Sequence, residues 1–133
     1  MLSGLYLVVA GCWWILVLGV FAYSAGPFSL ASNALGEVIV LVFFGWVSVL
    51  GSYYLQTCTL SLLAFGLATS SGLYSSAIML VNNIRDIATD QAVKKYTVAV
   101  ILGEHKARML LAMLIMGALI IHAIFAIQVS SIL

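Results

Sequence analysis

The sequence is poor in charge. Of its 133 residues only 7% are Asp, Glu, Lys or Arg, whereas 65% are hydrophobic, and the net charge is +1. Soluble globular chains carry about 25% charged residues, so five basic and four acidic side chains could not cover a soluble domain of this length. The composition excludes a soluble enzyme, a disordered segment and a protein that binds nucleic acid through bulk charge. It predicts an integral membrane protein, with residues 1–133 in a single domain.

Proline and cysteine are also scarce, with one and two residues respectively. The proline, Pro27, ends the helix-breaking stretch Ser-Ala-Gly-Pro. Cys12 lies in an apolar run and Cys58 in a short polar run, which indicates neither a disulfide framework nor a metal site. The sequence also contains no GxxxxGK[ST] phosphate loop, no GxGxxG fingerprint and no EF-hand loop. These absences exclude the common motifs of soluble nucleotide-binding and calcium-binding proteins.

Long apolar runs fill most of the chain. Eight of the nine charged residues lie between Arg85 and Arg108, and the ninth is Glu37. About 20 apolar residues cross a bilayer as a helix, so we expect four spans, at about residues 2–23, 37–55, 60–82 and 109–130, joined by a short turn and by loops 24–36 and 83–108. The runs are continuous rather than alternating, which favours helices over barrel strands. The predicted fold is an all-α integral membrane bundle.

The basic residues predict the orientation of this bundle. All five lie in or beside the connection between the third and fourth spans, so loops 83–108 and 24–36 should face the cytoplasm. We therefore expect a multi-pass protein of the cytoplasmic (inner) membrane. No basic segment precedes the first span, which is unlike a signal peptide. We interpret the chain as a piece of a larger bundle.

The stretch with the most chemical information is Asn-Asn-Ile-Arg-Asp-Ile-Ala-Thr-Asp, residues 82–90. It contains the pattern NxxxDxxxD, formed by Asn82, Asp86 and Asp90. On a continuous helix these three residues lie on one face, one turn apart. Mg²⁺ prefers such oxygen ligands and shares its coordination shell with waters and substrate phosphates. The pattern therefore indicates a Mg²⁺ site at the end of an apolar span.

Spacing alone leaves alternatives open. In one of them the stretch is the ordinary start of a solvated loop, where Asp86 pairs with Arg85 or Lys94 and binds no metal. Basic residues at Arg85 and Lys95 favour the metal site instead, because acids beside cations suit a metal-bridged diphosphate. A different class is a membrane transport or scaffold subunit with a cation-binding Asp pair, but acids at a span's end rather than at the bilayer centre disfavour it.

Both histidines have ordinary explanations. We expect His105, in the basic connection, to be a solvated or interfacial residue. We expect His122, within the fourth span, to be a hydrogen-bonded packing residue that faces a neighbouring helix.

Residues 82–90, followed by Lys95, Thr97 and Leu-Gly-Glu at 102–104, resemble the second aspartate-rich motif of the UbiA-type intramembrane prenyltransferases. Within that family they are most similar to the branch that prenylates 1,4-dihydroxy-2-naphthoate in menaquinone biosynthesis. Residues 23–28, 35–37 and 43–57 fit the same branch. The resemblance covers nearly the whole chain. One departure is Lys94, at a position where the family usually has glycine.

The resemblance implies a bundle of about nine helices, with two aspartate-rich motifs facing each other on the cytoplasmic side. The chain contains only the second motif, since Glu37 is the one acid that precedes Asp86. We therefore expect the chain alone to be inactive. The implied reaction is the Mg²⁺-dependent transfer of a polyprenyl group from polyprenyl diphosphate to an aromatic acceptor, here 1,4-dihydroxy-2-naphthoate.

The resemblance also implies roles for individual residues. The implied catalytic residues and metal ligands are Asp86 and Asp90, with Asn82 assisting as a ligand. The implied substrate-binding residues are Arg85, Lys95, Asn82 and Tyr23. The implied partners are the two substrates, the lipid bilayer and the remaining helices of the bundle.

Overall fold

The computed structural model describes residues 7, 10–11, 14, 17–18 and 34–130, and its regular elements in that part of the chain are helices. Three helical segments are long and apolar enough to cross a bilayer: Gly36–Thr57, Leu62–Arg85 and Glu104–Gln128. The predicted all-α membrane class is therefore confirmed. The predicted first span, loop 24–36 and the side chains of Cys12 and Tyr23 lie wholly or mostly outside the described residues.

The first described span is one continuous rod made of three helical elements: α2 (Gly36–Val40), the π-helix η2 (Leu41–Leu50) and α3 (Gly51–Thr57). It ends at Cys58, whose left-handed backbone (φ 54°) turns the chain. Ser61 then caps the next helix by accepting a hydrogen bond from the N–H of Ala64 at 3.1 Å. The short turn expected after the second span is present.

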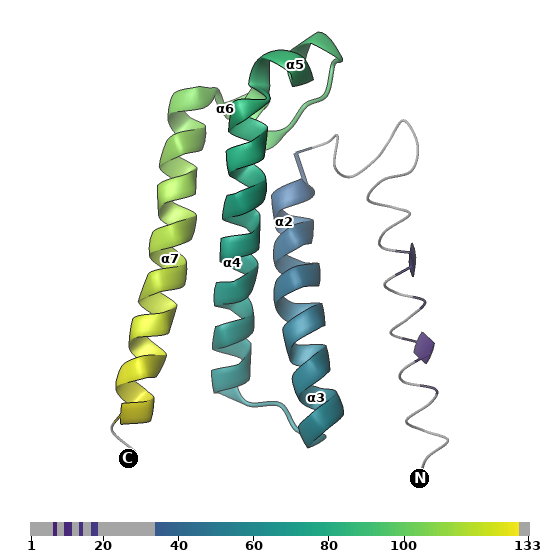
Figure 1. Cartoon of the computed structure of the whole chain (residues 1–133), viewed down its shortest axis with the longest axis vertical. Coiled ribbons are helices and arrows are strands. Elements are labelled where there is room, and N and C mark those ends of the chain that lie inside the picture. The colour runs from purple at the N-terminus through teal and green to yellow at the C-terminus, as the bar shows by residue number, and fades with distance from the viewer. Residues whose placement is uncertain (1–6, 8–9, 12–13, 15–16, 19–33, 131–133) are drawn as a thin grey trace.

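The central element is α4 (Leu62–Arg85), which lies between the α2–η2–α3 rod and α7 (Glu104–Ser130) (Figure 1). Its side toward the rod is lined by small residues. Gly72 packs so closely that an added Cβ would lie 2.7 Å from the carbonyl oxygen of Leu41, and one on Gly45 would lie 2.6 Å from that of Ala68. Such close approach of backbones is how helices associate in lipid, where burial of apolar surface contributes no driving force.

The contact between α4 and α7 combines small residues with polar ones. Ser70 is buried and lies 2.7 Å from Nδ1 of His122 and 3.3 Å from the carbonyl oxygen of Ala118. The ring of Phe125 covers Gly66, and the ring of Tyr74 lies 5.9 Å from that of His122. The prediction that His122 is a hydrogen-bonded packing residue facing another helix is confirmed.

The connection expected as loop 83–108 is largely helical. It contains the end of α4, the short helices α5 (Ile87–Ala92) and α6 (Val98–Leu102), and the first turn of α7. At the start of α7, Arg108 forms an i,i+4 ion pair with Glu104 at 2.7 Å, which adds slightly to the stability of the helix there. Hydropathy marks where a helix leaves the bilayer, not where the helix itself begins.

Candidate functional site

The candidate site lies at the end of α4 where all five basic residues gather (Figure 1). The α4 helix ends at Arg85. Asp86, with φ −96° and ψ 12°, is both the C-cap of α4 and the N-cap of α5. Hydrogen bonds of the helical type still pass through this break. The N–H of Asp86 donates to Asn82 O at 3.0 Å, and the N–H of Asp90 donates to Asp86 O at 2.8 Å.

The expectation of a straight stripe of ligands is therefore wrong in its geometry. Asn82 is exposed at the end of α4, Asp86 lies at the break, and Asp90 is buried within α5. Ile87, the first residue of α5, packs against a small core of Leu80, Ala99 and Ala107. The uniform helical periodicity from which the stripe was predicted is interrupted at Asp86.

Asp86 forms a two-pronged ion pair with its neighbour Arg85. Nε of Arg85 lies 2.8 Å from Oδ1, and Nη2 lies 3.0 Å from Oδ2. These hydrogen bonds from Arg85 hold the pKa of the Asp86 carboxyl below its usual range. The Asp86 side chain is 42% exposed, so the pair is accessible from solvent. This is the pairing foreseen in the alternative without a metal, and it also keeps both a cation and a carboxylate at the break.

Asp90 has a very different environment. It is buried, and its Oδ1 lies 3.4 Å from Nζ of Lys95. Its Oδ2 is the one buried side-chain nitrogen or oxygen in the described part of the chain that has no hydrogen-bond partner. A buried carboxylate oxygen without a partner is unfavourable by about 1–3 kcal/mol or more. Oδ2 is therefore a position where a cation or a donor would be stabilising.

Local backbone geometry places Lys95 beside Asp90. The N–H of Lys95 donates to Asp90 O at 2.9 Å, and Lys94 adopts a left-handed backbone with φ 56°. Glycine accepts this conformation without strain, which accounts for the glycine that the resembled family usually has there. Thr97 then caps α6 through its side chain, at 3.3 Å from the N–H of Val100.

The junction between α6 and α7 is made by Gly103. Its φ of 75° and ψ of 162° belong to a region of backbone space that essentially only glycine enters. This conformation directs α7 back along α4. The Leu-Gly-Glu motif at 102–104 therefore marks the corner between α6 and α7. The charged residues of this connection lie before and after the corner.

Sequence reasoning missed one polar pair. Glu37, in the first turn of α2, is buried, and its Oε1 accepts a hydrogen bond from Nδ2 of Asn83 at 2.8 Å. Asn83 is also buried. The signal available in the sequence was the position of Glu37, a single acid at the start of an apolar span.

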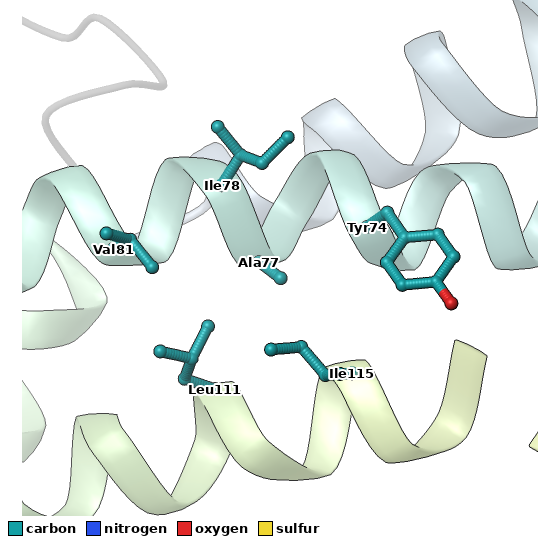
Figure 2. Close-up of a pocket in the computed structure, with 6 residues that line it drawn as sticks. All are labelled: Tyr74, Ala77, Ile78, Val81, Leu111 and Ile115. Atoms are coloured by element: carbon teal, nitrogen blue, oxygen red, sulfur yellow. The ribbon is translucent and has the colours of Figure 1, made fainter. Parts of the chain in front are cut away.

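An apolar groove of about 210 Å³ approaches the site between α4 and α7. Figure 2 shows that Val81, Ala77 and Tyr74 of α4 face Leu111 and Ile115 of α7 across it. Val81 precedes Asn82 directly in the chain. The groove therefore lies along α4 before the segment that carries the polar residues, and its lining is mostly hydrocarbon in character.

A divalent cation fits these residues only in part. Asp90 offers the unpartnered Oδ2, and Asp86 and Asn82 add oxygens nearby in the chain. Within the described residues no three His, Cys, Asp or Glu side chains group so as to hold a metal ion. A cation bound here would need further ligands from water, a phosphate or other helices.

Ionisable residues gathered at the end of a membrane-spanning bundle mark a candidate functional site. The profile of the UbiA prenyltransferase family matches residues 1–133, and the chain belongs to this family. The predicted resemblance is thus confirmed. No solved structure matches the chain significantly.

The relatives with curated names narrow the branch. The chain is 41% identical to the 1,4-dihydroxy-2-naphthoate octaprenyltransferase of Escherichia coli, over 93% of the chain and 44% of that protein. It is 34% identical to the protein of the same name from Mycobacterium leprae, over 98% of the chain and 44% of that protein. For the Bacillus subtilis protein of that name the identity is 31%, over 84% and 38%. The chain thus spans less than half the length of these relatives.

Proposed function

We propose that the chain supplies one half of the diphosphate site of a prenyltransferase that transfers a polyprenyl group to 1,4-dihydroxy-2-naphthoate, a step of menaquinone biosynthesis. The observation that carries the proposal is the unpartnered, buried Oδ2 of Asp90 beside Lys95, in the short helix α5 that follows the membrane-spanning α4. Relatives that bear the naphthoate octaprenyltransferase name support the choice of reaction and acceptor.

In this proposal each residue has a defined task. Asp90 and Asp86, assisted by Asn82, hold Mg²⁺, which when bound would neutralise charge on the leaving diphosphate. Lys95 contacts the diphosphate, and Arg85 moves from Asp86 to the phosphate oxygens, for which its planar fork is equally suited. Tyr23 is proposed to contact a substrate.

The apolar groove gives the hydrocarbon part of the substrate a path. Its lining follows α4 from Val81, the residue before Asn82 in the chain, back to Tyr74, away from the charged end. We propose that the polyprenyl chain enters it with its diphosphate at Asp86 and Asp90. Exclusion of water by the bundle would protect an allylic cation from hydrolysis until the electron-rich naphthoate ring attacks it. The ring would then lose its carboxylate as carbon dioxide, as the resemblance to the naphthoate branch implies.

The proposed arrangement in the cell follows from the charges. The charged end, with α5 and α6, faces the cytoplasm. There the charged diphosphate head group of the substrate is in contact with water. The protein lies in the cytoplasmic membrane. The chain acts together with further helices that carry the first aspartate-rich motif, from the same or a separate polypeptide.

The first experiment uses the chain alone. Purified in lipid nanodiscs with Mg²⁺, a polyprenyl diphosphate and dihydroxynaphthoate, it should form no prenylated product detectable by mass spectrometry, because half of the site is absent. Product formation by the isolated chain would refute the half-site proposal.

The second experiment uses an assembled bundle, in which the chain is expressed with the parts of the Escherichia coli relative that lie outside the 44% it matches. Product should form, and Asp86→Ala should lower the rate by about 10²-fold or more without changing the amount of chain in the membrane. The matched control is Glu104→Ala, which removes an exposed acid of α7 whose partner is Arg108. Equal rates for Asp86→Ala and the control would remove Asp86 from the site.

A further inference from the structure

The hydrogen-bonded pair of Glu37 and Asn83 lies near the site, and the proposed chemistry gives it no role. Glu37 receives two side-chain hydrogen bonds from α4. Ser76 Oγ donates to its backbone carbonyl at 2.6 Å, and Asn83 Nδ2 donates to its Oε1 at 2.8 Å. Ser76 and Asn83 are seven residues apart, so Glu37 contacts about 10 Å of one face of α4. The side chain therefore extends along α4 toward the candidate site.

Stability alone does not explain a carboxylate in this contact. Glu37 is only 7% exposed, and a buried polar or ionic pair is often no more stable than an apolar pair of the same shape. What such a pair does well is to select one arrangement of two helices, because any other arrangement leaves a buried charge without its donor. The pair is thus expected to fix how α2 and α4 are rotated relative to each other.

That rotation determines which side chains at the end of α4 are exposed at the candidate site. Neighbouring residues on a helix point about 100° apart, and here Asn83 is buried while Asn82 is exposed. A rotation of α4 that buried Asn82 would pull Asn83 away from Glu37. Fixing Asn83 against Glu37 therefore fixes the direction of Asn82 and the start of the break at Asp86.

We propose that Glu37 is a positioning residue, whose hydrogen bond to Asn83 holds the Asp86 end of α4 in the orientation that binds the metal–diphosphate group. The role of the pair in catalysis rests on the proposed function, whereas its role in helix orientation does not. Glu37 acts through Asn83, and no contact of Glu37 with a substrate is needed.

The test exchanges the two partners. Glu37→Gln combined with Asn83→Asp keeps an amide opposite a carboxylate but exchanges donor and acceptor, so the hydrogen bond can still form in the reverse direction. Asn83→Asp alone places two carboxylates face to face. Glu37→Leu removes the acceptor altogether. The control is Ser76→Ala, because the Glu37 carbonyl that Ser76 contacts also accepts from the backbone N–H of Leu41.

The first measurement is structural and is made on the full chain. Spin labels are attached at Val38→Cys and Thr89→Cys, both exposed positions, after Cys12 and Cys58 are replaced by serine. The distribution of label-to-label distances should broaden or shift in Asn83→Asp and Glu37→Leu. It should return to the width of the parent in the exchanged pair and stay unchanged in Ser76→Ala.

The second measurement is the Mg²⁺ concentration for half-maximal prenyl transfer in the assembled bundle, normalised to folded chain. It should rise about 10–100-fold in Asn83→Asp and Glu37→Leu, the range seen when residues that orient metal ligands are replaced. In the exchanged pair it should return to within about threefold of the parent, as for a restored orienting contact. A defect in folding alone would lower the amount of active chain without changing this Mg²⁺ requirement.

The outcomes separate the two proposals. If the exchanged pair is no better than Asn83→Asp in both measurements, the positioning role is overturned, even where Glu37→Leu fails to fold. Unchanged distances in Asn83→Asp would overturn it as well. If the parent bundle shows no transfer, the proposed function fails, while the distance measurement still decides whether Glu37 orients α4.

Discussion

The helices α4 and α7 have nearly the same length but opposite surroundings. In the spanning part of α4, 44% of the residues are buried, against 6% in α7. The buried helix is the less hydrophobic of the two, with a mean hydropathy of 1.3 against 2.7. In water the more apolar helix would lie inside, whereas in lipid the inner helix is the one whose small and polar residues make specific contacts.

The difference can be followed residue by residue. On α4, seven of the nine buried positions are occupied by alanine, glycine or serine, among them Ala68, Ser70 and Gly72. On α7, large side chains such as Met113, Met116 and Ile120 are exposed. Those side chains suit lipid, or further helices of a larger bundle, and need no partner within the described part of this chain. The contrast predicts that sensitivity to substitution follows close contact rather than hydropathy.

The largest effect is expected where backbones touch. Gly45→Ala and Gly72→Ala should each destabilise the chain by about 2–3 kcal/mol, because the new methyl group meets backbone atoms that cannot rotate away. Gly51→Ala is the matched control, since no atom lies within 4 Å of an added Cβ there. Unfolding of the purified chain by SDS in mixed micelles measures the difference. Equal stability of Gly72→Ala and Gly51→Ala would contradict the contact.

A smaller effect is expected at the polar contact with α7. Ser70→Ala removes the hydrogen bonds that the Ser70 hydroxyl makes with His122 and Ala118 and should destabilise the chain by about 0.6–1.7 kcal/mol, the range for such bonds between helices in membranes. Ser75→Ala serves as the control, because the Ser75 hydroxyl donates only to Ser71 O within α4. The same SDS titration applies. If Ser75→Ala is as destabilising as Ser70→Ala, interhelical bonding is not the cause.

On the exposed face of α7 the expected effect is smaller again. Met113, which is 61% exposed, should tolerate Met113→Ala with a change below about 0.5 kcal/mol in the chain alone. The same substitution in the assembled bundle shows whether Met113 faces lipid or another helix. A loss above about 1 kcal/mol there, but not in the chain alone, would show that another helix covers Met113.

The smallest effect concerns charge outside both spans. The pKa of Asp86 is lowered by the hydrogen bonds from Arg85, so the stabilisation is fully present above the unfolded-state pKa of about 3.9. It is lost as the pH falls through the lower folded-state pKa. Because the pair is exposed, the melting temperature should fall only slightly more for the parent than for Arg85→Gln between about pH 5 and about pH 3. Parallel melting curves for the two proteins would contradict the ion pair.

Hydropathy and charge were sufficient to predict the membrane class, the described spans and the gathering of charge beyond Asn82. They could not reveal the break at Asp86, because a periodic pattern carries no information on how α5 and α6 pack against the end of α4. Nor could they reveal the contact of Glu37 with Asn83, which are 46 positions apart. In both cases the missing information was tertiary packing, and it determines which oxygens are exposed or buried.

Gly103 has a consequence for genetics. The corner it forms ties the segment that carries Asp90 and Lys95 to the direction in which α7 leaves, and its backbone conformation excludes a side chain. A screen for inactive alleles should therefore recover Gly103 as readily as the acids. Such an allele would mimic a lesion in the chemistry although the altered atom sits in open space, and only a direct probe of chain geometry would tell the two apart.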